Sequence, residues 1–147
     1  MSRVLDSRHG RVLLHNKHVP RDSLVVLDPV TDEQQVLPDL HLCHESRASN
    51  AAVLCPSATP GCRSSGRPFL VVFVGITNDH VTHHCFYSSD STSWSEPASH
   101  RIRCFKNGCG DVVGPSLLVG DVLYFAVDRV DGILRYDVVR RALSAID

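Results

Sequence analysis

The sequence predicts an all-β protein, and three observations carry that prediction. Short apolar runs are separated by nine glycines and eight prolines, and few segments keep a 3.6-residue period long enough to require a helix. The run Phe69–Val74 is β-branched or aliphatic or aromatic throughout and is bounded by Pro68 and Gly75, which is typical of a strand covered on both faces. The strands also recur at a regular spacing, which indicates a repeated unit.

Further apolar runs have the length and composition of strands. They cover residues 10–14, 23–27, 52–55, 84–87, 116–119 and 122–125, with another short apolar piece around Leu5. Two of the predicted strands are followed by a polar turn, at 28–32 and 88–92, and then by a return strand at 35–38 and 94–97. Pro, Asp and Ser dominate these turns because they preset or hydrogen-bond the turn backbone.

The C-terminal segment 133–146 fits two patterns. Its apolar positions 134, 138, 139, 142, 143 and 146 form a helical stripe. Tyr136-Asp137, however, falls at the register that Leu27-Asp28 occupies in the first repeat. We therefore predict two strands here, with a helix as the alternative.

The strand spacing repeats along the chain. In three places the centres of neighbouring strands lie 13 or 14 residues apart: Leu13 and Leu27, Val72 and Phe86, and Leu123 and Tyr136. Repeats of about 40 to 50 residues with four strands each are typical of β-propeller blades. We predict a single propeller-like domain over residues 1–147, with about three four-stranded antiparallel blades near 3–38, 51–97 and 115–147 and loops at 41–50, 58–67 and 99–114.

Composition limits the partners and the compartment. Fifteen Lys and Arg against sixteen Asp and Glu give a net charge of -1, so we expect no nucleic-acid partner and no membrane partner. No apolar run approaches the length of a membrane span, and charges near the N-terminus argue against a signal peptide. We expect an intracellular protein, cytoplasmic or nuclear, whose six cysteines are reduced.

Five motifs in order resemble a known family. The segments 7–14, 26–31, 72–75, 87–97 and 115–124 together resemble the kelch-like, F-box-associated propeller region of plant F-box proteins. The resemblance implies a propeller that selects the protein to be ubiquitinated. No helical F-box precedes Arg8, so binding of the ubiquitin-ligase adaptor is not expected. Three blades are also fewer than the usual minimum of about four, so we expect an incomplete propeller whose open blade edges allow self-association.

A histidine-rich stretch suggests metal chemistry. His80, His83, His84 and Cys85 place four possible ligands within six residues. In a strand, His83 and Cys85 point to one face and His84 to the other, so they do not all converge on one ion. Packing is therefore the favoured interpretation, with Cys85 as a small core residue. Cys43-His44, Cys104 and Cys109 are more distant candidate ligands without a spacing that supports them.

No catalytic motif is complete. The segment 114–118 lacks the final small residue of a nucleophile elbow, and the acids Asp28, Asp90, Asp121 and Asp137 fit turn positions. We therefore expect a non-enzymatic protein-interaction module without catalytic, cofactor or metal residues. Its partner-binding residues are not identified, and the loops at 41–50, 58–67, 77–83 and 99–114 are the places to search. The alternatives are a metal-binding or hydrolytic β protein using His80–Cys85, and a degenerate fragment without activity.

Overall fold

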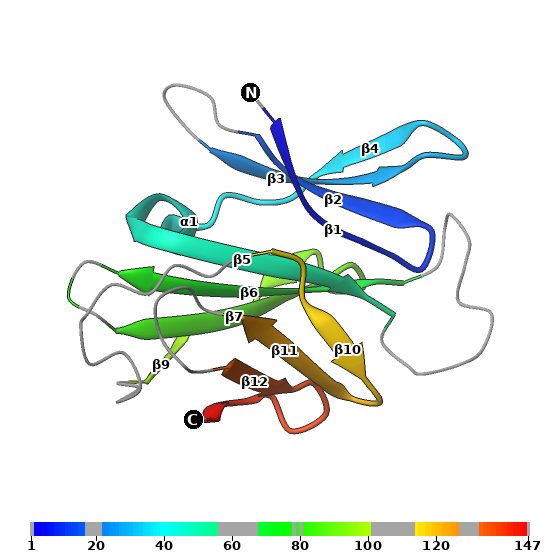
Figure 1. Ribbon diagram of the computed structural model, residues 1–147. Helices are drawn as coiled ribbons and strands as arrows, with labels where there is room; N and C mark the ends of the chain where they lie inside the picture. The colour runs from blue at the N-terminus through cyan, green and yellow to red at the C-terminus, as the bar shows by residue number, and fades with distance from the viewer. Residues whose placement is uncertain are drawn as a thin grey trace.

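The chain folds into three antiparallel sheets that are stacked one on another (Figure 1). The computed structural model describes residues 2–16, 22–55, 68–77, 79, 81–100, 114–126 and 133–146, except for the side chains of 47 and 48. The N-terminal sheet has the order β1 (Ser2–Arg8), β2 (Arg11–Asn16), β3 (Ser23–Asp28) and β4 (Glu33–Val36). The middle sheet has the order β5 (Ser46–Leu54), β6 (Leu70–Thr77), β7 (Thr82–Ser88) and β8 (Ser93–Trp94), and β9 (Ala98–His100) also pairs with β7. The C-terminal sheet has the order β10 (Leu117–Val119), β11 (Val122–Ala126), β12 (Ile133–Asp137) and β13 (Ala142–Ile146).

The predicted all-β class is confirmed, because every element but one in the described part of the chain is a strand. Each sheet runs up and down in sequence order, apart from β9. Within the described residues the sheets form no closed ring, so the incomplete propeller stays a prediction. None of the described helical residues forms a segment with the length and hydropathy needed to cross a membrane.

The segment 41–50 was expected to be a loop, and that expectation is wrong. A single helix, α1 (His41–Glu45), links the first two sheets, and β5 begins directly after it at Ser46. Leu42 and Cys43 on α1 are buried, so the segment contributes to the core instead of lying on the surface. The loop predicted from residue 99 is also wrong at its start, since Ala98–His100 forms β9; residues 101–113 of that loop, and all of the loop at 58–67, lie outside the described residues.

The C-terminal segment forms two strands, β12 and β13, as predicted. Leu134, Tyr136 and Leu143 are buried, and the residues between them in each strand are more exposed. This alternation has the two-residue period of a half-buried strand. Burial in this segment therefore follows the two-residue period of a strand and not the helical stripe that the same residues also form.

The hairpin that closes each sheet is built in the same way. A residue with positive φ stands four positions after the end of the preceding strand in all three: Asp32 at 61°, Thr92 at 53° and Arg141 at 54°. In the first and third hairpins the carboxylate of Asp28 or Asp137 accepts hydrogen bonds from the turn backbone, at 2.9 to 3.4 Å. The predicted turn role of these two acids is confirmed, and the match indicates a repeated structural unit.

The middle sheet is buried on both faces. Val71 and Phe73 on β6 belong to the hydrophobic core shared with the N-terminal sheet and α1. Val72 and Val74 belong to a second core shared with the C-terminal sheet. The continuous apolar run of β6 is thus explained, and the prediction of a strand covered on both faces is confirmed.

Candidate functional site

The histidine-rich stretch contributes to packing in the middle sheet. Cys85 lies in the core shared with the N-terminal sheet, and burial raises the pKa of its thiol to about 12. His84 points to the other core, where its ring stacks on His100 at 5.3 Å and meets Tyr136 edge-on at 5.4 Å. Burial, followed by the neighbouring imidazoles of His100 and His83, lowers the pKa of His84 to about 4. The predicted split between the two faces of a strand is confirmed for these residues.

Within the described part of the chain, His83, His84 and Cys85 belong to no group of three converging metal ligands. His80 lies outside the described residues. The metal prediction for this stretch therefore receives no support from the side chains that can be placed.

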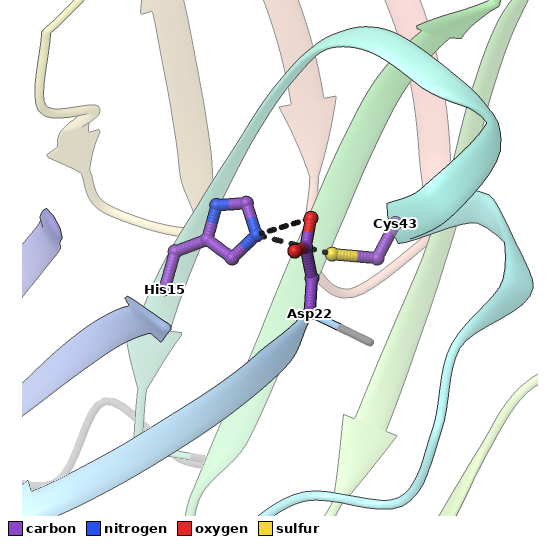
Figure 2. Close-up of side chains that lie close together, drawn as sticks. All are labelled: His15, Asp22 and Cys43. Carbon is purple, nitrogen blue, oxygen red and sulfur yellow. Dashed lines mark hydrogen bonds and ion pairs between the residues drawn. The ribbon is translucent and has the colours of Figure 1, made fainter. Parts of the chain in front are cut away.

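A different set of side chains converges between the N-terminal sheet and α1. His15 on β2, Asp22 immediately before β3 and Cys43 on α1 each bring one ligand atom to within 4.8 Å of the others. Figure 2 shows the imidazole, carboxylate and thiol pointing toward one another. We call these three residues the His15 cluster.

Local structure explains how each residue of the cluster is placed. Burial alternates along β2, and His15 continues the buried row of Arg11 and Leu13. His15 is therefore a polar residue at a core-facing position. The turn of α1 aims Cys43 inward, and Cys43 is 7% exposed. Asp22 is the more accessible member, with 29% of its side chain exposed.

The distances in the cluster define its chemistry. His15 Nε2 lies 3.3 Å from an Asp22 carboxylate oxygen and 3.6 Å from Cys43 Sγ. A nucleophilic Cys-His-Asp triad needs the two imidazole nitrogens to contact different partners, one activating the thiol and the other held by the carboxylate. Here both contacts are made by the same nitrogen. The arrangement therefore lacks triad geometry and instead brings three ligand atoms around a common point.

A pocket of about 230 Å³ reaches this point, and Asp22 and Cys43 are both part of its wall. Most of the remaining lining is apolar and comes from β3 and from the link between β4 and α1. Asp39 also lines the pocket, where its carboxylate pairs with His44 at 2.7 Å. The two neighbouring candidate ligands Cys43 and His44 therefore face different partners, since His44 is paired with Asp39 and Cys43 contacts His15.

A second pocket, of about 490 Å³, lies where β1 approaches β5 and the start of β10. Asp6 in its wall is 3% exposed and accepts a hydrogen bond from the Val53 backbone N–H at 2.8 Å. Arg8 pairs with Asp6 at 3.3 Å and donates to the Ser116 carbonyl at 2.7 Å. These bonds join the edge strand β1 to the edge strand β5 and to Ser116, the residue before β10. Burial raises the pKa of Asp6, against the opposing effects of the Val53 hydrogen bond and Arg8.

Trp94 packs at the boundary between the first two sheets. Its ring lies 5.5 Å from that of Tyr87 and 6.5 Å from that of Phe73, and its Nε1 donates to the Pro38 carbonyl at 2.9 Å. It therefore joins the middle sheet to the chain that leaves the N-terminal sheet.

The expectation that every cysteine is reduced is wrong, because Cys55 is disulfide-bonded. The expectation came from the inferred compartment, whereas a disulfide depends on whether two thiols come within bonding geometry. Cys43 and Cys85 are not in disulfides. Cys62, Cys104 and Cys109 lie outside the described residues.

No known protein family, curated protein or solved structure matches the chain.

Proposed function

We propose that the chain is a non-enzymatic protein-interaction module, of the kind implied by its resemblance to the substrate-recognition region of F-box proteins. The observation that carries this proposal is the character of the two outermost sheet faces. The sheets at the ends of the stack have one face buried against the middle sheet, and their other faces are rich in exposed aliphatic residues.

The outer face of the N-terminal sheet carries a row of aliphatic side chains. Val4, Leu14, Val25 and Val36 lie directly opposite one another across its four strands. Residues paired in this way project from the same face of a sheet. Val4 is 62% exposed and Val36 is 65% exposed, whereas Val25 between them is 1% exposed. The row is therefore open to solvent at its two ends and covered in its middle.

The outer face of the C-terminal sheet is similar. Four of its aliphatic side chains are 42% to 63% exposed: Leu117, Val119, Ile133 and Ile146. Along each strand these residues alternate with less exposed ones, so they project from the face turned away from the core. Among the described residues, the remaining exposed large hydrophobic side chains are Val30 and Val139, both in hairpin turns. Exposed aliphatic residues thus concentrate on two sheet faces.

Exposed aliphatic side chains grouped on one sheet face are a common feature of protein-protein interaction surfaces. The proposed occupant is another polypeptide, a substrate protein by the family resemblance. Self-association was expected at the open blade edges and is a separate prediction from these faces. The small net charge gives no long-range attraction for nucleic acid. The proposal therefore rests on apolar burial and not on electrostatics.

Site-specific photo-crosslinking tests the proposal. A photoreactive amino acid is placed at Val36 or Leu117 on the sheet faces, and at Val30 or Val139 in the turns as exposed controls. Cross-linked proteins from an extract of the source cells are then identified by mass spectrometry, after light scattering has established the oligomeric state.

We expect specific cross-links at the sheet-face positions, either to another protein or to a second copy of the chain, and few at the turn positions. An unlabelled competitor that carries Val36→Asp or Leu117→Asp should fail to suppress those cross-links, whereas a Val139→Asp competitor should suppress them normally. Equal cross-linking at faces and turns would overturn the proposal.

A further inference from the structure

We propose that the His15 cluster is a binding site for a zinc-class divalent cation, a site separate from the interaction faces. The cluster combines an imidazole nitrogen, a carboxylate oxygen and a sulfur. These are the donor types that Zn²⁺ takes in proteins. Three protein ligands leave one position of a tetrahedral ion for water.

The spacing of the donor atoms fits one ion. Around a tetrahedral zinc with bonds of about 2.3 Å to sulfur and about 2.1 Å to nitrogen and oxygen, the sulfur and nitrogen lie about 3.6 Å apart and the nitrogen and oxygen about 3.4 Å apart. The observed separations are 3.6 Å from Cys43 Sγ to His15 Nε2 and 3.3 Å from His15 Nε2 to the Asp22 carboxylate. Two of the three separations therefore already match coordination, and the third, between Asp22 and Cys43, lies within 4.8 Å.

The contacts of His15 with Asp22 and Cys43 have poor hydrogen-bond geometry, which also favours a bound cation. Charge-assisted N–H···O bonds are usually 2.7 to 2.9 Å long, and the His15–Asp22 distance is longer. His15 Nε2 makes both contacts, so as a donor it shares one proton between the Asp22 carboxylate and the Cys43 sulfur. A cation between the three atoms would replace that shared proton, since all three donors then direct lone pairs at it.

The pocket gives a cation access to the His15 cluster, and the charges of the ligands suit a divalent ion. The pocket of about 230 Å³ gives the ion a path past Asp22 and Cys43. On binding, the Cys43 thiol releases its proton to solvent as the Zn–S bond forms. The carboxylate and the resulting thiolate together balance the charge of the cation, so the buried sulfur does not remain as an uncompensated anion.

The proposal predicts a structural consequence. The three ligands come from β2, the residue before β3, and α1, so an ion would fasten the N-terminal sheet to the helix that leads into the middle sheet. Binding to the folded state alone raises stability with the ratio of metal concentration to Kd. Zinc should therefore raise the unfolding temperature of the full chain.

The test measures metal binding by the full chain, first stripped with a chelator and then titrated with Zn²⁺ against a chromophoric chelator. Co²⁺ serves as a spectroscopic probe, because a thiolate ligand gives a charge-transfer band and tetrahedral geometry gives intense visible bands. Asp22→Asn is the main variant, since Asp22 is partly exposed and its replacement should not prevent folding. Asp39→Asn is the matched control from the same pocket wall.

We expect one zinc per chain, binding at least about tenfold weaker in Asp22→Asn, and unchanged binding in Asp39→Asn. Cys43→Ser should remove the thiolate-to-cobalt band, and Zn²⁺ should protect Cys43 from alkylation as mapped by mass spectrometry. Absence of stoichiometric zinc, or binding that is unchanged in both Asp22→Asn and Cys43→Ser, would overturn the proposal. The proposal would also be overturned if the double variant His83→Gln/His84→Gln lost zinc binding while Asp22→Asn bound zinc normally. That result would place the zinc site on β7.

Discussion

Replacing Asp6 with Ala should cost more stability than any other single carboxylate in the described part of the chain. Asp6 is 3% exposed, and its carboxylate accepts hydrogen bonds from the backbone N–H groups of Val53 at 2.8 Å and Ser7 at 2.9 Å. It also pairs with Arg8, whose side chain is 15% exposed. One side chain therefore satisfies two backbone donors and compensates a partly buried cation.

The size of the effect follows from what Asp6→Ala leaves behind. The Val53 N–H is buried and loses its acceptor, which costs about 1–3 kcal/mol. Arg8 loses its counter-charge, and breaking a buried ion pair by removing one partner costs about 3–5 kcal/mol when both groups are fully desolvated. Arg8 is not fully buried, and burial raises the pKa of Asp6, so removal of the charge recovers part of its desolvation. We expect a net loss of about 3 kcal/mol in the free energy of unfolding.

Urea denaturation followed by fluorescence measures this loss. Trp94 is the only tryptophan and packs against the core shared by the first two sheets, so it reports on the region that Asp6 connects. Asp28→Ala is the matched control, because Asp28 also accepts backbone hydrogen bonds but does so in an exposed turn; it should cost about 1 kcal/mol. The variant Arg8→Ala completes a double-mutant cycle that isolates the ion pair.

A loss below about 1 kcal/mol for Asp6→Ala, with an unchanged slope against urea, would refute the reasoning. So would a loss equal to that of Asp28→Ala. Either result would mean that β1 and β5 are held together by their apolar contacts alone, and that the hydrogen bonds and ion pair of Asp6 make no net contribution to stability.

Three further predictions concern the middle sheet. The pKa of His84 is lowered to about 4 from 6.5, so the unfolded chain binds more protons between these values and stability should fall by roughly 3 kcal/mol as the pH drops through that window. His84→Gln should flatten this dependence in urea titrations, and equal slopes in the two proteins would refute it. A Cβ at Gly75 would overlap Ser46 Oγ, so Gly75→Ala should lower the free energy of unfolding by about 1–3 kcal/mol, as measured by urea unfolding. The double variant with Ser46→Gly should recover most of this loss, and no recovery would contradict the steric explanation. Burial raises the pKa of Cys85 to about 12, so iodoacetamide at pH 8 should alkylate this thiol slowly in the folded chain and fast in urea. Peptide mass spectrometry follows the reaction, and equally fast labelling in the folded chain would show that the thiol is not buried.

Much of the strand content could be predicted because local pattern and tertiary environment agree. The apolar run of β6 indicates burial on both faces, and the sheet lies between two others. The turn at Asp28 and the turn at Asp137 share both residue type and geometry. In these places the backbone preference, the hydrogen-bonding side chain and the core all favour the same conformation.

The helix α1 could not be predicted, because it is only five residues long and no side chain caps its N-terminus. Its stability comes from the burial of Leu42 and Cys43 between sheets, a contribution that exists only after the sheets have assembled. Short helices are marginal without such packing. A periodicity argument over five residues has too little signal to detect it.

The same reason explains why the sequence suggested one metal site and the structure assembles another. His80, His83, His84 and Cys85 are close in sequence, but a strand sends successive side chains to opposite faces, so proximity along β7 separates its ligands. Cys43 is 28 residues from His15, and it meets His15 and Asp22 only because β2 and β3 are neighbours and α1 packs against them. One sequence signal for the cluster existed: His15 continues the alternation of Arg11 and Leu13 one residue beyond the predicted strand 10–14, which places an imidazole on a core-facing row. A buried imidazole requires a polar partner, so the useful question for such a histidine is which distant segment supplies the partner. In this fold the answer includes a carboxylate and a thiol from two separate segments.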